Sequence, residues 1–182
     1  MSSSNQESVI AVGERVYLRR PVKDDLDSYY GWYRDPEIQK YMANPHWDPQ
    51  RSKDRYREIF VRRHLLTTGE SQSFTICENQ EGRAVGVVVS YDIDRGSGMC
   101  EIGILIGNPV HRCRGFAKEA IELMLNYLHN RIGICIVRCN IHPENDASIR
   151  LFEKCGFRKS GEKQEFGFDL FMYERNIENP TE

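Results

Sequence analysis

Hydrophobic positions along the chain recur at two spacings, which alternate from one segment to the next. The segment RVYLRR, residues 15–20, has the alternation of a strand, and Pro21 ends it. From residue 23 to about residue 35, apolar side chains return every three to four positions, which predicts a helix, and PEIQKYM then forms a short turn. Asp48 suits a helix N-cap and Pro49 the first helical position, so a second helix is expected from there to about residue 66.

Three apolar runs separated by turn residues occupy the middle of the chain. They read QSFTICE, AVGVVVSYDID and MCEIGILIG, and together they predict an antiparallel meander. The amphipathic segment FAKEAIELMLNYLHNRI then predicts a long helix. It is followed by a strand, ICIVRCNI, a helix, DASIRLFEKCG, and a final hairpin of GFRKSGE and FGFDLFMYE.

This order of elements predicts one α/β domain. Layer packing places the helices against a mixed, mostly antiparallel central sheet, and we expect about seven strands flanked by about four helices. No repeat or linker interrupts the pattern. We expect residues 1–12 to be a disordered N-terminal lead, residues 13–176 to form the single domain, and residues 177–182 to be a C-terminal tail.

Composition and charge narrow the class of protein. Of the 182 residues, 40% are hydrophobic and 29% are charged, and the net charge of −2 gives no reason to expect a nucleic-acid partner. No apolar run approaches the roughly 20 residues that span a bilayer, and the start MSSSNQES lacks the features of a secretory signal. We therefore expect a cytoplasmic protein that does not associate with membranes.

The cysteines and histidines do not indicate a disulfide framework or a metal site. No two of the six cysteines have CxxC spacing, which suits reduced thiols in the cytoplasm. Cys135, Cys139 and His142 form the only cluster of metal-binding residue types, and the two cysteines would share the core face of a strand. We expect no metal.

The segment HRCRGFAKEA joins an apolar strand to the long helix and has the features of an anion site. A glycine at this junction lets a ligand approach the backbone, and the first N–H groups of the helix point out of its end. The helix dipole and the side chains of Arg112 and Arg114 would favour phosphate. A plain strand-to-helix turn with surface arginines fits the same residues about equally well.

Three motifs, taken together, resemble the GNAT superfamily of N-acetyltransferases. RCRGFA is similar to the signature R/Q-x-x-G-x-G/A, CEIGILIGNPVH resembles the fourth strand of the family, and NDASIRLFEKCGF resembles its motif N-x-x-S-I-x-x-Y/F-x-K-x-G-F. The resemblance covers residues 15–174 and implies a GNAT-like fold. The N-terminal pattern LRRP…DDLDSYYGWYRDPEI resembles the branch that contains the ribosomal-protein-alanine N-acetyltransferases.

The resemblance implies that acetyl-CoA is the acetyl donor and that the fourth and fifth strands of the sheet splay apart to admit it. The end of the fourth strand would pair with the pantetheine arm, one backbone N–H there would polarise the thioester carbonyl, and the following loop would hold the pyrophosphate. The residues implied in cofactor binding are Leu105, Ile106, Gly107, Arg112, Cys113, Arg114, Gly115, Phe116, Ala117, Lys118, Asn145, Phe152 and Lys154.

The family reaction, direct attack of a primary amine on the thioester, requires a group that accepts the proton of the amine. The resemblance implies Glu101 for this role, although a solvated glutamate paired with a basic neighbour fits its position too. The thiolate that leaves needs a proton, and the usual tyrosine of the family is replaced here by Phe152. Ser148 is a substitute candidate, helix capping is its alternative role, and water is chemically adequate.

The acceptor pocket of the family is lined by the first two helices, their loop and the last hairpin. The candidate contact residues here are Tyr30, Trp32, His46 and Trp47. The acceptor could be a protein N-terminal α-amine or a small amine such as a polyamine, an aminoglycoside or an amino sugar. A non-catalytic acyl-CoA-binding module is the alternative function, and a homodimer is a further expectation.

Overall fold

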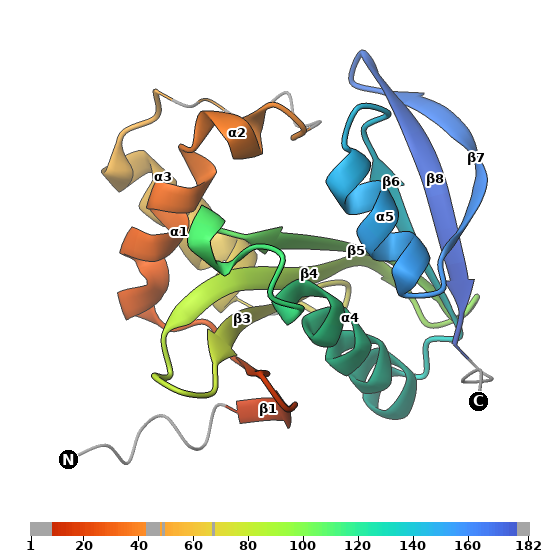
Figure 1. The fold of residues 1–182 in the computed structure, drawn as a ribbon, viewed down its shortest axis with the longest axis horizontal. Helices are drawn as coiled ribbons and strands as arrows, with labels where there is room; N and C mark the ends of the chain where they lie inside the picture. The colour runs from red at the N-terminus through yellow and green to blue at the C-terminus, as the bar shows by residue number, and fades with distance from the viewer. Residues whose placement is uncertain (1–8, 43–47, 49, 67, 178–182) are drawn as a thin grey trace.

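The strand patterns of the sequence pair into one eight-stranded sheet in a computed structural model that describes residues 9–42, 48, 50–66 and 68–177 (Figure 1). The strands follow the order β1-β2-β3-β4-β5-β6-β8-β7 across the sheet. Every neighbouring pair is antiparallel except β5 and β6, which are parallel. The strands are β1 (Val9–Val12), β2 (Val16–Arg19), β3 (Gln72–Glu78), β4 (Ala84–Asp94), β5 (Met99–Ile106), β6 (Ile136–Ile141), β7 (Arg158–Glu165) and β8 (Phe168–Asn176).

The mixed α/β fold that the sequence predicts is confirmed, with one strand more than expected. The additional strand is β1, which pairs with β2 and packs Ile10 and Ala11 against the core. The expectation that the disordered lead extends to residue 12 was therefore wrong at residues 9–12, because VIAV has enough apolar surface to extend the sheet. Residues 1–8 and 178–182 lie outside the described part of the chain.

Within the described ranges, five α-helices flank the sheet, and four short helical segments adjoin them. The α-helices are α1 (Leu26–Tyr33), α2 (Pro36–Gln39), α3 (Lys53–Phe60), α4 (Phe116–Tyr127) and α5 (Asp146–Lys154), and the short segments are η2 (Lys23–Asp25), η3 (Val61–Leu65), η4 (Pro109–His111) and η5 (Leu128–Ile132). No helix within the described ranges is long and apolar enough to cross a membrane.

Two helix starts differ from the prediction. α3 begins after Ser52, whose hydroxyl accepts a hydrogen bond from the backbone N–H of Arg55 at 3.4 Å. Asp48, the predicted N-cap, instead accepts from the N–H of Gln50 and forms a local turn. The predicted turn PEIQKYM contains the helix α2, capped by Asp35.

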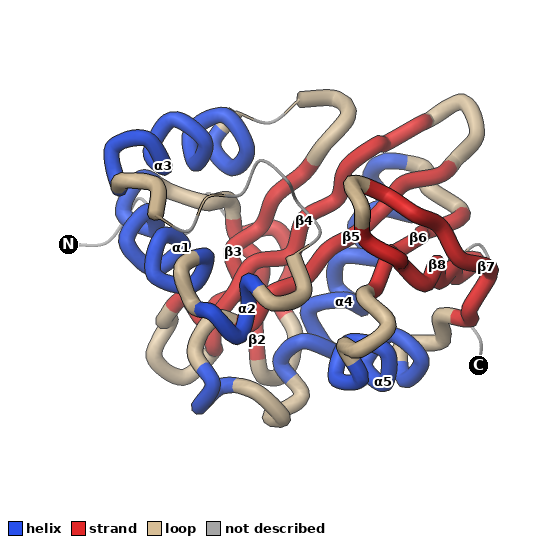
Figure 2. The backbone as a smooth tube through the Cα atoms, turned by 90° about the horizontal axis from the view of Figure 1, so that it is seen from above, coloured by secondary structure: helices blue, strands red, loops and turns tan. Residues whose placement is uncertain are grey.

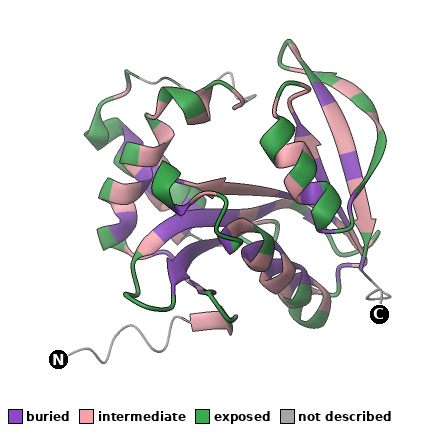
Figure 3. Cartoon of the chain, in the orientation of Figure 1, coloured by how far each residue is buried: buried purple, intermediate pink, exposed green. Residues whose placement is uncertain are grey.

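Helices cover the two faces of the sheet unequally (Figure 2). α4 and α5 pack on one face over the main core, which contains residues such as Phe74, Ile121 and Phe152. α1, α3 and η3 cover the opposite face at β3 and β4 and enclose a smaller aromatic cluster. All residues of β3 are consequently buried, whereas the edge strand β7 has no buried residue (Figure 3).

Candidate functional site

Strands β5 and β6 pair over only three residues each and then separate. The register joins Met99–Glu101 of β5 to Ile136–Arg138 of β6, and no further pair joins them among the described residues. Beyond that point β5 runs toward α1, while β6 and β8 run alongside α5 (Figure 1). Residues 102–106 of β5, here called the unpaired edge, are paired with β4 on one side only. Such an edge can accept an extended ligand as an additional strand.

The unpaired edge ends at Gly107, against which Trp32 of α1 packs closely. A Cβ atom at Gly107 would overlap the indole ring of Trp32. Leu105 and Trp32 both belong to the aromatic cluster under α1 and α3. The structure thus brings together Gly107, expected to contact the cofactor, and Trp32, expected to contact the acceptor.

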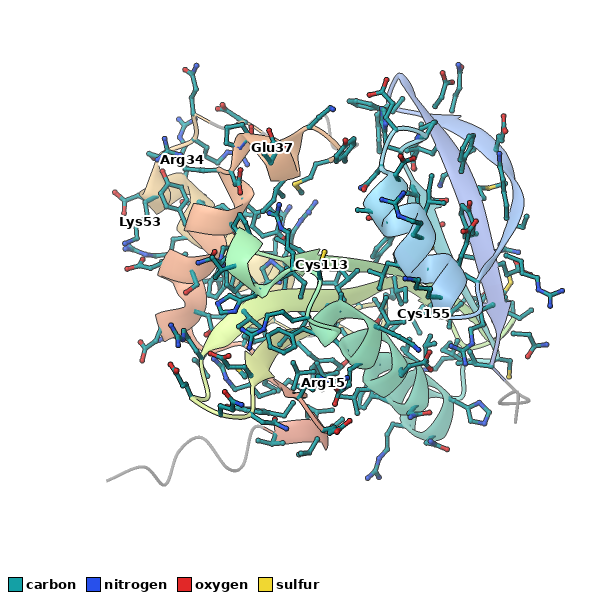
Figure 4. All side chains as sticks on the ribbon, in the orientation of Figure 1. Arg15, Arg34, Glu37, Lys53, Cys113 and Cys155 are labelled. Carbon is teal, nitrogen blue, oxygen red and sulfur yellow. The ribbon has the colours of Figure 1, made fainter. Side chains whose placement is uncertain are left out.

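The loop after β5 leads into α4 through backbone conformations that favour an anion site. Cys113 and Gly115 have positive φ angles of 58° and 83°, and Gly115 is the N-cap of α4. No side chain of the described residues caps this helix, so its first N–H groups face out of the helix end. Cys113 is exposed and lies beside the start of α4 (Figure 4). The loop can present several N–H groups to one phosphate.

The side chain of Arg112 points back toward β5 and α1. Its guanidinium donates hydrogen bonds to the carbonyl oxygens of Ile106 and Gly107, each at 3.4 Å. It also forms an ion pair with Asp35 at 3.7 Å. Arg112 therefore fastens the end of the unpaired edge to the α1–α2 junction, and in this structure its side chain is engaged on the protein.

Two other arginines flank the start of α4. Arg15 Nη1 lies 3.4 Å from the position that a Cβ of Gly115 would take, and the Arg114 guanidinium stacks over the ring of Phe116 at 4.9 Å. Both arginines, with Asn79 and other neighbours, line a hollow of about 260 Å³. Glu14 and Glu78 line the same hollow, so two arginines and two glutamates lie near the helix end that presents free N–H groups.

Glu101 lies where β5 and β6 begin to separate, and several polar groups hold it. Its Oε2 accepts a hydrogen bond from Nδ2 of Asn140 at 2.6 Å, and its Oε1 lies 3.8 Å from Nζ of Lys163. Tyr91, its partner on β4, has a raised pKa, because burial and then the negative charge of Glu101 disfavour the phenolate. The carboxylate is about one fifth exposed, at 22% of its side-chain surface.

Two α5 residues that were expected to contact the cofactor have structural contacts of their own, Asn145 as the helix cap and Phe152 in the core. Asn145 is the N-cap of α5, and its side chain accepts a hydrogen bond from the N–H of Ser148 at 3.1 Å. Phe152 is buried and meets Phe157 edge to face at 5.1 Å. Lys154 is exposed at the last residue of the helix.

The expected acceptor residues are only partly described by the structure. Tyr30 donates its hydroxyl to the carbonyl oxygen of Arg51 at 3.0 Å and packs against Tyr56, so it joins α1 to the start of α3. His46 and Trp47 lie outside the described residues.

Sequence reasoning missed the two polar groups that hold Glu101. Asn140 lies two residues after Arg138, which pairs with Glu101, so strand alternation could have placed it on the same face. Lys163 carried no such signal, because β6 and β8 lie between its strand and β5 in the sheet. Among the described residues, no group of three or more His, Cys, Asp or Glu side chains could hold a metal ion.

Comparison with known proteins gives matches over most of the chain. A family model described as an acetyltransferase (GNAT) domain matches residues 15–158. The uncharacterized N-acetyltransferase p20 of Bacillus licheniformis is 30% identical, over 81% of this chain and 82% of that protein.

Solved structures share the fold at lower identity. Spermidine N-acetyltransferase from Vibrio cholerae, in complex with CoA and spermine, superposes with a TM-score of 0.75 at 22% identity, covering 88% of this chain and 95% of that one. Mycobacterium smegmatis RimJ, in complex with CoA-disulfide, gives a TM-score of 0.75 at 17% identity, covering 90% of this chain and 82% of that one. These two likenesses establish the fold.

Proposed function

The chain belongs to the acetyltransferase (GNAT) family. From this premise we propose that it transfers the acetyl group of acetyl-CoA to a primary amine, with Glu101 as the base that accepts the proton of the amine. The observation that carries the proposal is the position of this carboxylate. Glu101 is the last residue of β5 that pairs with β6. It lies directly before the unpaired edge, which leads through the following loop to the start of α4. A single continuous path thus joins a candidate base to a phosphate-binding helix end.

In this proposal the donor binds along that path. The backbone of Leu105–Gly107 pairs with the pantetheine arm as an added strand would, and an N–H of Leu105 or Ile106 polarises the thioester carbonyl. The backbone of Arg112–Lys118 holds the pyrophosphate, with the positive end of α4 behind it. Arg15 and Arg114 contribute positive charge beside the loop, while Arg112 keeps the end of the edge in place.

Glu101 accepts the proton that the amine loses. The nitrogen lone pair attacks the thioester carbon, a C–N bond forms and the C–S bond breaks, and the ammonium proton passes to the carboxylate directly or through one water. Asn140 fixes one carboxylate oxygen at 2.6 Å, which leaves the other turned toward Lys163 and available to the acceptor. Holding the base in one orientation lowers the entropy cost of the attack.

The leaving thiolate takes its proton from solvent or from Ser148. Phe152 occupies the position of the tyrosine that serves as the acid in many relatives, and its ring is buried in the core. A thiol has an ordinary pKa of about 8.5, so protonation by water is adequate near neutral pH. The same substitution motivates the second candidate function, a non-catalytic module that binds acyl-CoA.

A thiol-release assay over a panel of primary amines tests the proposal. The wild-type protein should acetylate at least one amine, and Glu101→Gln should lower kcat about a hundredfold or more, since general base catalysis contributes about 10²–10⁴. Affinity for acetyl-CoA should stay within about twofold, because the pantetheine path is intact.

Glu174→Gln is the matched control, because it makes the same substitution nearby in the sheet. Glu174 lies on β8 and forms an ion pair with Arg138 of β6 at 2.8 Å. This variant should retain the kcat of the wild type. If acetyl-CoA binds and no amine is acetylated, the module is the better account. If Glu101→Gln turns over as fast as the wild type, Glu101 is not the base.

A further inference from the structure

Lys163 is the one described cation within ion-pair distance of the proposed base, and it comes from a distant strand. β7 is the outer strand of the sheet, and β8 and β6 separate it from β5. Nζ of Lys163 nevertheless lies 3.8 Å from Oε1 of Glu101. The β7–β8 hairpin must therefore curve over the face of the sheet on which Glu101 lies.

Lys163 also has a second acidic partner. Its Nζ lies 3.1 Å from Oε2 of Glu165 on the same strand, closer than Glu101. Lys163 and Glu101 are 28% and 22% exposed, respectively, so solvent reaches both groups but does not surround them. The ion pair of Lys163 with Glu101 is the longer of the two. Lys163 can therefore stay paired with Glu165 when Glu101 binds another cation.

Charges near Glu101 are otherwise balanced within the sheet. Arg138 on β6 is paired with Glu174 on β8 at 2.8 Å. Asn140 is neutral and holds only Oε2 of Glu101. Lys163 is thus the cation beside Oε1, and the Tyr91 side chain on β4 also interacts with Glu101. The position of Lys163 is where an amine must arrive if Glu101 is to take its proton.

We infer that Lys163 sets the charge specificity of the acceptor: it occupies the ammonium position beside Glu101 until the acceptor arrives, and it selects primary amines with one positive charge over polyamines. The inference rests on the proposed role of Glu101. An incoming ammonium replaces Lys163 at Oε1, and Lys163 stays paired with Glu165 close by. Compared with the same site without Lys163, the retained cation disfavours a second positive charge on the acceptor, and the carboxylate of Glu165 offsets part of this repulsion.

The size of the effect follows from Coulomb's law. A second ammonium within roughly 7 Å of Lys163, in the partly hydrated surroundings of a half-buried site, should be disfavoured about tenfold. Salt should reduce the effect, because a distance of this size is comparable with the Debye length of about 8 Å at physiological ionic strength.

The test compares hexylamine with 1,6-diaminohexane, which share a six-carbon chain and differ in one terminal ammonium group. The readout is the ratio of kcat/KM for the diamine to that for the monoamine, corrected for the two reactive ends of the diamine. Lys163→Met should raise this ratio about tenfold and Lys163→Arg should leave it unchanged. Lys159→Met is the control on the same strand, since Lys159 pairs with Glu162 at 2.7 Å and should not affect the ratio. Thermal unfolding checks that each variant is folded.

The outcomes separate this inference from the proposal on which it rests. A ratio that rises in Lys163→Met and stays constant in Lys163→Arg and Lys159→Met supports the charge role. A ratio unchanged in Lys163→Met, while Glu101→Gln still abolishes turnover, overturns the inference and leaves the base in place. Unaltered turnover in Glu101→Gln overturns the proposed function, and with it the premise of the inference.

Discussion

At the scale of single residues, Gly107 is required for space. Its N–H donates to the carbonyl oxygen of Val85 at 3.0 Å, and the indole of Trp32 covers the side where a side chain would be. Because Arg112 also binds the carbonyl of Gly107, the end of β5 is held by α1, β4 and the loop after β5 together. The position of the unpaired edge therefore depends on the close packing of Gly107 against Trp32.

We expect Gly107→Ala to destabilise the protein by about 1–3 kcal/mol, as overpacking usually does. In the background of Trp32→Ala the same substitution should cost less, because the ring that it overlaps is gone. Urea unfolding of the two single variants and the double variant measures the coupling, which should be at least about 0.5 kcal/mol. Additive effects would show that the two residues do not compete for this space.

Phe166 combines strain with exposure at the tip of the β7–β8 hairpin. Phe166 and Gly167 have φ angles of 52° and 82° between the paired residues Glu165 and Phe168, the pattern of a two-residue type I′ turn. This turn favours Asn-Gly, and the Phe166 side chain is 60% exposed, so it gains little from burial. The residue therefore costs stability where it stands.

Phe166→Asn should raise the free energy of unfolding by about 1 kcal/mol, because asparagine adopts the left-handed conformation more readily. Phe166→Ala should give no comparable gain, since alanine shares the steric penalty. Chemical denaturation of both variants beside the wild type provides the comparison. Equal stability of Phe166→Asn and Phe166→Ala would mean that the turn is not strained.

At the scale of elements, sequence periodicity predicted best where a segment is long and its surroundings are local. The bounds of β3 and β4 agree with the apolar runs to the residue, because turn residues such as those of NQEGR and DRGSG end each run. β1 was missed because four apolar residues beside a polar start show no period. The start of α3 was placed too early because an aspartate before a proline suits a turn as well as a cap.

The candidate site divides in the same way. The loop from Arg112 to Gly115 is a local motif, and its glycine has the left-handed conformation that such a junction needs. The contacts of Glu101 with Asn140 and Lys163 join three strands that are distant in the sequence. Strand alternation could place Asn140 on the face of Glu101, but local pattern carries no information on the contact with Lys163, which lies three strands away in the sheet.

The packing of η3 on β3 makes stability depend on pH. His64 is buried between Tyr29 and Phe60, and Nδ1 lies 2.8 Å from Oγ of Ser73. Burial, and next the positive charge of Arg63, lower the pKa of His64 from 6.5 to about 4. Above pH 6.5 neither the folded nor the unfolded form binds a proton there. Between pH 6.5 and 4 only the unfolded form does, so stability falls as the pH falls.

We expect His64 to remove up to about 3 kcal/mol from the free energy of unfolding between pH 6.5 and 4. His64→Gln, which keeps a hydrogen-bonding side chain without a titrating group, should show a shallower pH dependence in that window. Urea midpoints measured at half-unit steps of pH would reveal the difference. Parallel curves for the two proteins would place the titration elsewhere.

At the scale of the whole molecule, the site lies where two parts of one sheet separate. α1, α3 and η3 cover one face of the sheet at β3 and β4, and α4 and α5 pack on the opposite face (Figure 2). β5 supplies the unpaired edge and Glu101, α4 supplies the helix end, and β7 supplies Lys163. Donor and acceptor would thus meet where the three paired residues of β5 and the three of β6 still join the two parts of the sheet.

Amide hydrogen exchange with and without saturating acetyl-CoA tests this arrangement most directly, because it locates the donor whatever the acceptor is. Pairing of the pantetheine with the unpaired edge should slow exchange in residues 102–106, and phosphate binding should slow it in residues 112–118, in the same experiment. Binding of acetyl-CoA with slowed exchange in residues 112–118 alone, or in neither segment, would contradict the account.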